Sequence, residues 1–252
     1  MNDRARKAVI FLPILGTLII AAVIGGLIVI QDHRQAAQIQ KAEAVAQDYL
    51  SDVATFRTTI VGQIAKDRDG DPGRLRKIVD KALAAPPTLP DAPSYGRNNS
   101  SAYAEASRAE ASLTTPYRRL SHELAAADVA LDFVRAAQKA LGLRASNYIG
   151  PGLITDSSDV RSTLIPAFVE ARDTFDKARV PSGQDALAAK VRGPVQYVID
   201  QATLLADRVD ARQNFSFTYN QEFQAAADAV NNYATTVRGD LTEAINSIAD
   251  DS

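Results

Sequence analysis

The stretch IQKAEAVAQDYLSDVATFRTTI, residues 39–60, decides the fold class. Its apolar and small side chains recur at alternating steps of three and four residues, at Ile39, Ala42, Ala46, Tyr49, Val53, Phe56 and Ile60. Such steps place side chains on one stripe of an α-helix, because the helix turns once in about 3.6 residues. The stretch therefore predicts a long helix with a coiled-coil-like seam.

The same spacing returns in three later stretches, residues 117–141, 160–178 and 195–248. An amphipathic helix cannot bury its stripe alone, so these helices are expected to pack on one another. We predict an all-α fold in which residues 31–252 form an antiparallel helical bundle with long, coiled-coil-like helices. Residues 214–220, NFSFTYN, alternate with period two, but we interpret them as helical because the spacing of three and four resumes in register after them.

Turn-forming residues separate the predicted helices. Residues 67–73, DRDGDPG, are expected to end the first helix. Residues 85–101 contain four prolines and several other turn formers, which predicts an extended loop without regular structure. Pro166 is expected to kink the helix of residues 160–178, because proline lacks the amide hydrogen that a helix interior uses.

Residues 8–30, AVIFLPILGTLIIAAVIGGLIVI, carry no charged side chain. About 20 helical residues cross a hydrocarbon core of about 30 Å, so this segment is long enough to span a membrane. The alternative is a cleaved signal peptide, whose apolar region is shorter and ends in small residues. The segment continues into Gln31, Asp32, His33 and Arg34, which favours a retained signal anchor.

The flanking charges predict the orientation of this anchor. Arg4, Arg6 and Lys7 precede it, and positively charged flanks stay in the cytoplasm. We therefore expect residues 1–7 to be a cytoplasmic tail and residues 31–252 to lie outside the plasma membrane of a single-pass protein.

Small residues line one face of the predicted spanning helix. Thr17, Ala21 and Gly25 are spaced by four, and so are Ala22 and Gly26. Such a face lets a second helix approach closely, so these residues are candidates for packing against another integral membrane protein. The alternative is that alanine and glycine are simply frequent in spanning helices.

The amino-acid composition limits the partners and reactive groups that the chain can have. The chain has 28 basic and 30 acidic residues and no cysteine. This charge balance argues against a nucleic-acid partner, and the lack of cysteine excludes disulfides and thiolate ligands. A cysteine-free exported domain of this size can fold on its core alone, which favours a bacterial protein.

No motif predicts catalysis, a cofactor or a metal. Asp67, Asp69 and Asp71 alternate as in calcium loops, but Pro72 and Ile78 occupy the positions where such loops need glycine and glutamate. The two histidines, His33 and His122, have no second ligand at helical spacing. The tripeptide Arg238-Gly239-Asp240 lies within a predicted helix rather than an exposed loop. We therefore predict a protein that is not an enzyme.

Two functions are compatible with these features. The first is a non-catalytic accessory or scaffold subunit of a larger plasma-membrane or envelope complex, for example a respiratory assembly. It would contact other integral membrane proteins through its spanning helix and its exported bundle, and the lipid bilayer through the spanning helix. The alternative is a ligand-sensing or solute-binding bundle. In plan, the exported part resembles the helical ligand-binding domains of bacterial chemoreceptors, although those receptors have a second span and a cytoplasmic signalling region.

Overall fold

The computed structural model describes residues 31–67, 71–150 and 154–250. Within these ranges the chain is helical and contains no β-strand, which confirms the all-α prediction. The α-helices are α1 (Gln31–Lys66), α2 (Pro72–Leu83), α3 (Ser94–Asn99), α4 (Ser101–Leu113), α5 (Thr115–Leu141), α6 (Ile165–Asp176), α7 (Asp185–Asp210) and α8 (Asn220–Asp250). A short 3₁₀ turn, η1 (Ala145–Asn147), and a π-helical turn, η2 (Val160–Leu164), lie between α5 and α6.

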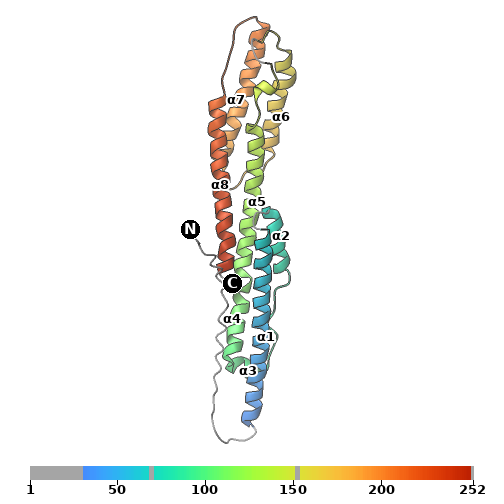
Figure 1. The fold of residues 1–252 in the computed structure, drawn as a ribbon, viewed down its shortest axis with the longest axis vertical. Coiled ribbons are helices and arrows are strands. Elements are labelled where there is room, and N and C mark those ends of the chain that lie inside the picture. Colours follow the sequence, from blue (N-terminus) through green and yellow to red (C-terminus); the bar gives the residue numbers. More distant parts are fainter. Residues whose placement is uncertain (1–30, 68–70, 151–153, 251–252) are drawn as a thin grey trace, which may run out of the picture.

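The helices build an elongated molecule with two helical groups along its length (Figure 1). The proximal group contains α1, α2, α3, α4 and the first half of α5. The distal group contains the second half of α5 with α6, α7 and the first half of α8. Helices α5 and α8 run through both groups and pack against each other. From Ser101 to Leu141 the chain is helical except near Thr114, a length of about 60 Å at 1.5 Å per residue.

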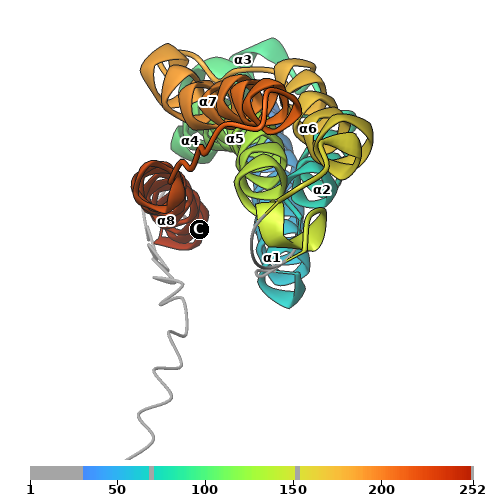
Figure 2. The same cartoon turned by 90° about the horizontal axis from the view of Figure 1, so that it is seen from above.

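The distal group is an antiparallel four-helix bundle, viewed from its end in Figure 2. Helices α6 and α7 are antiparallel, because Arg161 bonds Asp207 while Asp176 bonds Arg192. Helices α5 and α8 are also antiparallel, since the Gln138 amide donates to Asn231 while Leu124, earlier in α5, shares an apolar cluster with Ile245, later in α8. This group matches the predicted antiparallel arrangement.

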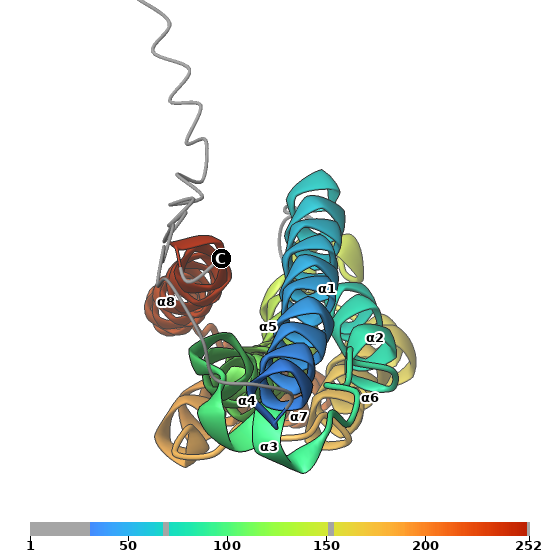
Figure 3. The same cartoon turned by 90° about the horizontal axis from the view of Figure 1, so that it is seen from below.

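In the proximal group the prediction of antiparallel packing is wrong for one pair. Helix α1 runs parallel to α4, and α5 continues in the direction of α4. Gln38 of α1 lies against Gly96 just before α4, and Phe56, further along α1, stacks edge-on with Tyr117 just after α4. After α2, residues 84–93 run back along the molecule to the end where α1 starts, and α3 begins there (Figures 1 and 3).

The seam of residues 39–60 is buried as the spacing predicts. Ala42, Ala46, Tyr49, Val53 and Ile60 are all at most 4% exposed. Three apolar clusters follow one another along the molecule. The first surrounds Tyr49 and Leu113, the second joins Ile60 to Leu124, and the third fills the distal group around Phe133 and Phe168. An elongated bundle therefore has a core divided along its axis rather than one central core.

The prediction of irregular structure over residues 85–101 is wrong at residues 94–99, which form α3. Ser100 then caps α4 by accepting a hydrogen bond from the Tyr103 amide at 3.1 Å. The segment is also tied to α4, since the Leu89 amide donates to Glu110 at 2.8 Å. Hydrogen bonds to side chains therefore hold this proline-rich segment in a defined conformation, whereas its prolines alone predict only that it lacks a regular helix.

The interpretation of residues 214–220 as helical is also wrong for all but the last of them. Helix α7 ends at Asp210, residues 213–219 have no regular secondary structure, and α8 starts at Asn220. Arg212 adopts a left-handed backbone conformation with φ of 57°. Its amide donates to Val209, and the Gln213 amide donates to Arg208, the two bonds of a Schellman cap. Glycine is the usual residue here, and a side chain in this conformation costs about 1–2 kcal/mol.

Pro166 lies in the first turn of α6, directly after the π-helical turn η2. The predicted disturbance at this proline is therefore a change of helix type, because the missing amide hydrogen is tolerated at a helix start.

Across residues 31–67, 71–150 and 154–250, none of the helices is both long and apolar enough to cross a membrane. The predicted span, residues 8–30, lies outside the described ranges.

Candidate functional site

The site residues predicted from the sequence precede the part of the chain that the structure describes. This holds for the proposed packing face, Thr17, Ala21, Ala22, Gly25 and Gly26, and for the topology residues Arg4, Arg6 and Lys7. The structure therefore brings none of them together, and the predicted role of each stays a prediction.

The described aspartates before α2 contact the first residues of that helix. The Asp71 carboxylate accepts a hydrogen bond from the Gly73 amide at 2.8 Å and so caps α2. Asp67 pairs with Arg74 at 2.7 Å, while Asp69 lies outside the described residues. Across the ranges described, no three or more acidic or histidine side chains gather as a metal site.

The remaining motif residues lie on helix surfaces. His122 is exposed on α5, and the tripeptide Arg238-Gly239-Asp240 lies inside α8, as the spacing of three and four predicts. A helical backbone cannot present this tripeptide in the loop conformation that its recognition needs.

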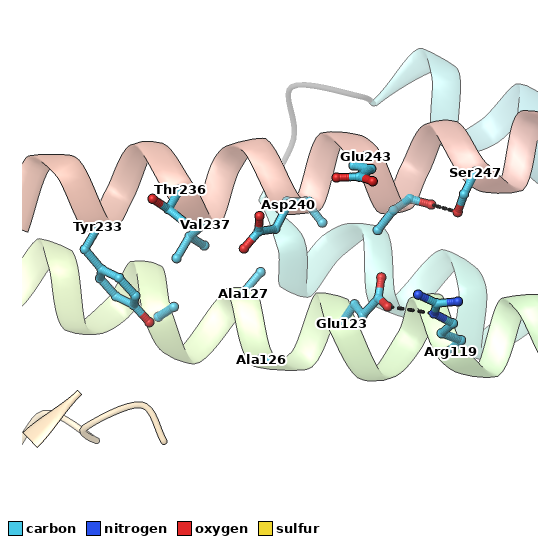
Figure 4. A pocket seen from close by; sticks show the side chains of 13 residues that line it. Arg119, Glu123, Ala126, Ala127, Tyr233, Thr236, Val237, Asp240, Glu243 and Ser247 are labelled. Carbon is cyan, nitrogen blue, oxygen red and sulfur yellow. Dashed lines mark hydrogen bonds and ion pairs between the residues drawn. The ribbon is translucent and has the colours of Figure 1, made fainter. Parts of the chain in front are cut away.

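A groove runs between α5 and α8 where the two helical groups meet, and we call it the waist groove (Figure 4). Its volume is about 550 Å³. Its lining residues on α5 are Arg119, Glu123, Ala126, Ala127 and Ala130, and on α8 they are Tyr233, Thr236, Val237, Asp240, Leu241, Glu243, Ala244 and Ser247.

Small side chains create the groove. On α5, Leu120 and Leu124 turn into the second core cluster, and Ile245 on α8 joins them there. The neighbouring face of α5 carries Ala126 and Ala127. An alanine methyl group fills less space between two helices than a leucine side chain does. The core holds the backbones of α5 and α8 together on one side, so a channel stays open between them on the alanine side.

The rim of the groove is mainly acidic. Glu123 pairs with Arg119 at 3.0 Å along α5. Asp240 and Glu243 stand exposed on α8, and the structure gives neither carboxylate an ion pair with any described residue. The groove therefore presents uncompensated negative charge beside an apolar floor.

Tyr233 closes the end of the groove that faces the distal group. Its ring packs edge-on against Phe133, with ring centroids 6.5 Å apart. Burial raises the pKa of the Tyr233 phenol, so the hydroxyl keeps its proton at neutral pH and remains available as a hydrogen-bond donor. A neutral phenol at one end and carboxylates along the rim fit a partner with basic and amide groups.

Sequence reasoning missed this groove. Only Ala127 belongs to the seam found in residues 117–141, and the alanines beside it give no sign of a channel on their own. The pairing of α5 with α8 supplies the second wall, and that pairing joins segments about a hundred residues apart.

Comparison with protein-family models, curated proteins and solved structures found no match to this chain.

Proposed function

We propose that this chain is a non-catalytic, membrane-anchored scaffold or accessory subunit of a bacterial plasma-membrane or envelope complex. Residues 8–30 anchor it, Arg4, Arg6 and Lys7 hold its N-terminus in the cytoplasm, and the helical bundle stands outside the membrane.

The position of α1 supports this proposal most strongly. The described part of α1 starts at Gln31, which follows the apolar segment in the sequence, and this end of α1 lies at one end of the elongated molecule (Figure 1). An anchor attached at this end would let the bundle project from the bilayer with the distal group furthest away. A projecting rod can reach a partner at a defined height, which is the role of a scaffold.

The waist groove is the proposed contact for a partner outside the membrane. Its apolar floor and acidic rim suit an amphipathic helix that carries lysine or arginine beside small apolar residues. Such a helix would pair its cations with Asp240 and Glu243, which lack cationic partners among the described residues.

Filling the waist groove is expected to weaken partner binding. We expect Ala126→Trp to reduce co-purification with the partner complex by about tenfold or more, because a tryptophan side chain would occupy the space left by the methyl group. The measurement is quantitative mass spectrometry of proteins retained with the full chain from gently solubilised membranes.

Ala186→Trp is the matched control, since Ala186 is an exposed helical alanine on α7, away from the groove. A photo-reactive side chain at Thr236 should cross-link to the same partner that Ala126→Trp loses. Equal recovery of all partners with both tryptophan variants would remove the groove from the proposal.

The anchor is expected to contribute through its small-residue face. Replacing Ala21 and Gly25 together by leucine should leave insertion and orientation intact, because both depend on hydrophobicity and the flanking charges. It should reduce co-purification with a membrane partner, because leucine keeps a second helix at a distance. Valine at Leu18 and Ile24 should have much less effect. If the double leucine variant retains its partner fully, the span acts only as an anchor.

Ligand sensing is the second candidate function. It is favoured by a separate cavity at the distal end, between α7 and the segment that precedes α8.

A further inference from the structure

A second hollow, which we call the distal cavity, lies under the segment that connects α7 to α8. Its volume is about 710 Å³, within the range of small-molecule sites. Apolar side chains from three parts of the chain form much of its wall. They are Ala145, Ile149 and Ile154 before α6, Leu205 and Val209 on α7, and Phe215, Phe217 and Tyr219 on the connecting segment.

The aromatic part of this wall comes from alternate residues of the segment 213–219. Exposure alternates along it, with Asn214, Ser216 and Thr218 exposed, so Phe215, Phe217 and Tyr219 share the inner side. All three are half-buried, and their neighbouring ring centroids are 6.3 and 6.1 Å apart. The period-two pattern of NFSFTYN therefore produces an aromatic wall rather than a strand or a helical seam.

The wall is fixed in place at its end. The Tyr219 hydroxyl accepts a hydrogen bond from the Ala145 amide at 2.8 Å. Its ring also packs edge-on against Phe223 in the distal core, with centroids 5.1 Å apart. A wall tied to both η1 and α8 offers a preformed surface, so a ligand would not have to order it.

Arg212 adds a cation to the lining of the cavity. The other cations around the end of α7 are engaged: Arg161 bonds both Asp207 and Asp210 at 2.8 Å, and Arg208 bonds Gln213. No described residue forms an ion pair or a side-chain hydrogen bond with Arg212. It also occupies the cap position where glycine would be less strained.

The carboxylates nearby do not compete for this guanidinium. Asp210 accepts hydrogen bonds from Ser157 at 2.6 Å and from Arg161. These two bonds lower the pKa of Asp210, so it stays ionised and paired at neutral pH. Arg212 is therefore left as the charge that a ligand can meet.

We propose that the distal cavity binds a small amphipathic anion, with an aromatic or branched hydrocarbon body and a carboxylate or sulfonate group. The body would lie against Phe215, Phe217 and Leu205, because aromatic rings favour edge-on and offset contacts with one another. The anionic group would form charge-assisted hydrogen bonds with Arg212. This inference deepens the second candidate function and does not depend on the scaffold role.

The test uses naphthalene sulfonate and its uncharged counterpart naphthyl methanol. Each is titrated calorimetrically into the full chain held in lipid nanodiscs, and the heat from empty nanodiscs is subtracted. We expect saturable binding of the sulfonate. Arg212→Gln should weaken sulfonate binding by about tenfold or more and should change naphthyl methanol binding by less than about twofold. Arg179→Gln, which removes an exposed arginine between α6 and α7, should change neither.

Two further variants separate binding from folding. Arg212→Gly removes the guanidinium but suits the left-handed cap, so it should raise the unfolding temperature while weakening sulfonate binding as Arg212→Gln does. Thr155→Trp, at an exposed residue that lines the cavity, should block both compounds by filling it. The proposal is overturned if the wild-type chain binds no sulfonate, or if Arg212→Gln binds it as tightly as the wild type. Cross-linking at Thr236 in the waist groove should be unchanged throughout, which distinguishes failure here from failure of the scaffold proposal.

Discussion

Replacing Phe168 with alanine is expected to lower the free energy of unfolding of the distal group by about 3–5 kcal/mol. Phe168 is fully buried, and its ring packs against Tyr148, which follows η1, and against Tyr219 and Phe223 at the start of α8. Alanine would leave a cavity that these three rings cannot close together, because the helix or turn that carries each ring holds it in place.

Hydrogen exchange of the full chain measures this effect locally. Amides of α6 and α7 should lose protection in Phe168→Ala, while those of α1 and α4, which belong to a separate apolar cluster, should change little. Tyr197→Ala is the control, because Tyr197 is 39% exposed and its loss should cost less than about 1 kcal/mol. Equal protection in wild type and Phe168→Ala would contradict the assigned distal core.

Gly96→Ala is expected to be the most damaging small substitution in the proximal group. A Cβ atom at Gly96 would lie 2.1 Å from the carbonyl oxygen of Gln38 and 2.9 Å from Cβ of Ala42. The obstacle is partly backbone of α1, so no side-chain rotation can relieve it, and α3 would have to move away. We expect a loss of about 1–3 kcal/mol, as for other overpacked contacts.

Gly239→Ala provides the matched control, since nothing lies within 4 Å of a Cβ atom built there. That variant should gain about 0.5–1 kcal/mol, because alanine favours a helix interior over glycine. The two variants are compared by thermal unfolding followed by circular dichroism. The close packing of α3 on α1 would be contradicted if Gly96→Ala were as stable as Gly239→Ala.

The sequence predicts the long helices well because their signal is local. The seam of residues 39–60 lies in α1, and the seam from Tyr117 to Leu141 lies in α5, with most of the expected residues buried. The direction in which one helix runs relative to another has no such local signal. The parallel pairing of α1 with α4 depends on the return of residues 84–93, and such a return path has no periodic signature.

Errors at the breaks have similar physical causes. The sequence does not reveal the end of α7, because Arg212 occupies the cap position at which a glycine would indicate a helix end. Helix α3 is missed because it is short and is held by its contact with α1 rather than by an apolar stripe. The waist groove and the distal cavity each combine residues from distant segments, so neither is visible in any single stretch of sequence.

In the proposed arrangement, residues 8–30 anchor the chain and the bundle stands outside the plasma membrane. Because the chain has no cysteine, single cysteines report topology without background. Ser182→Cys introduces one at an exposed position between α6 and α7, and Asn2→Cys introduces one before the apolar segment. Both variants are treated in spheroplasts with a maleimide that does not cross membranes. The account predicts that Ser182→Cys is labelled at once and that Asn2→Cys is labelled only after lysis. Labelling of Asn2→Cys with protection of Ser182→Cys, or protection of both until lysis, would contradict it.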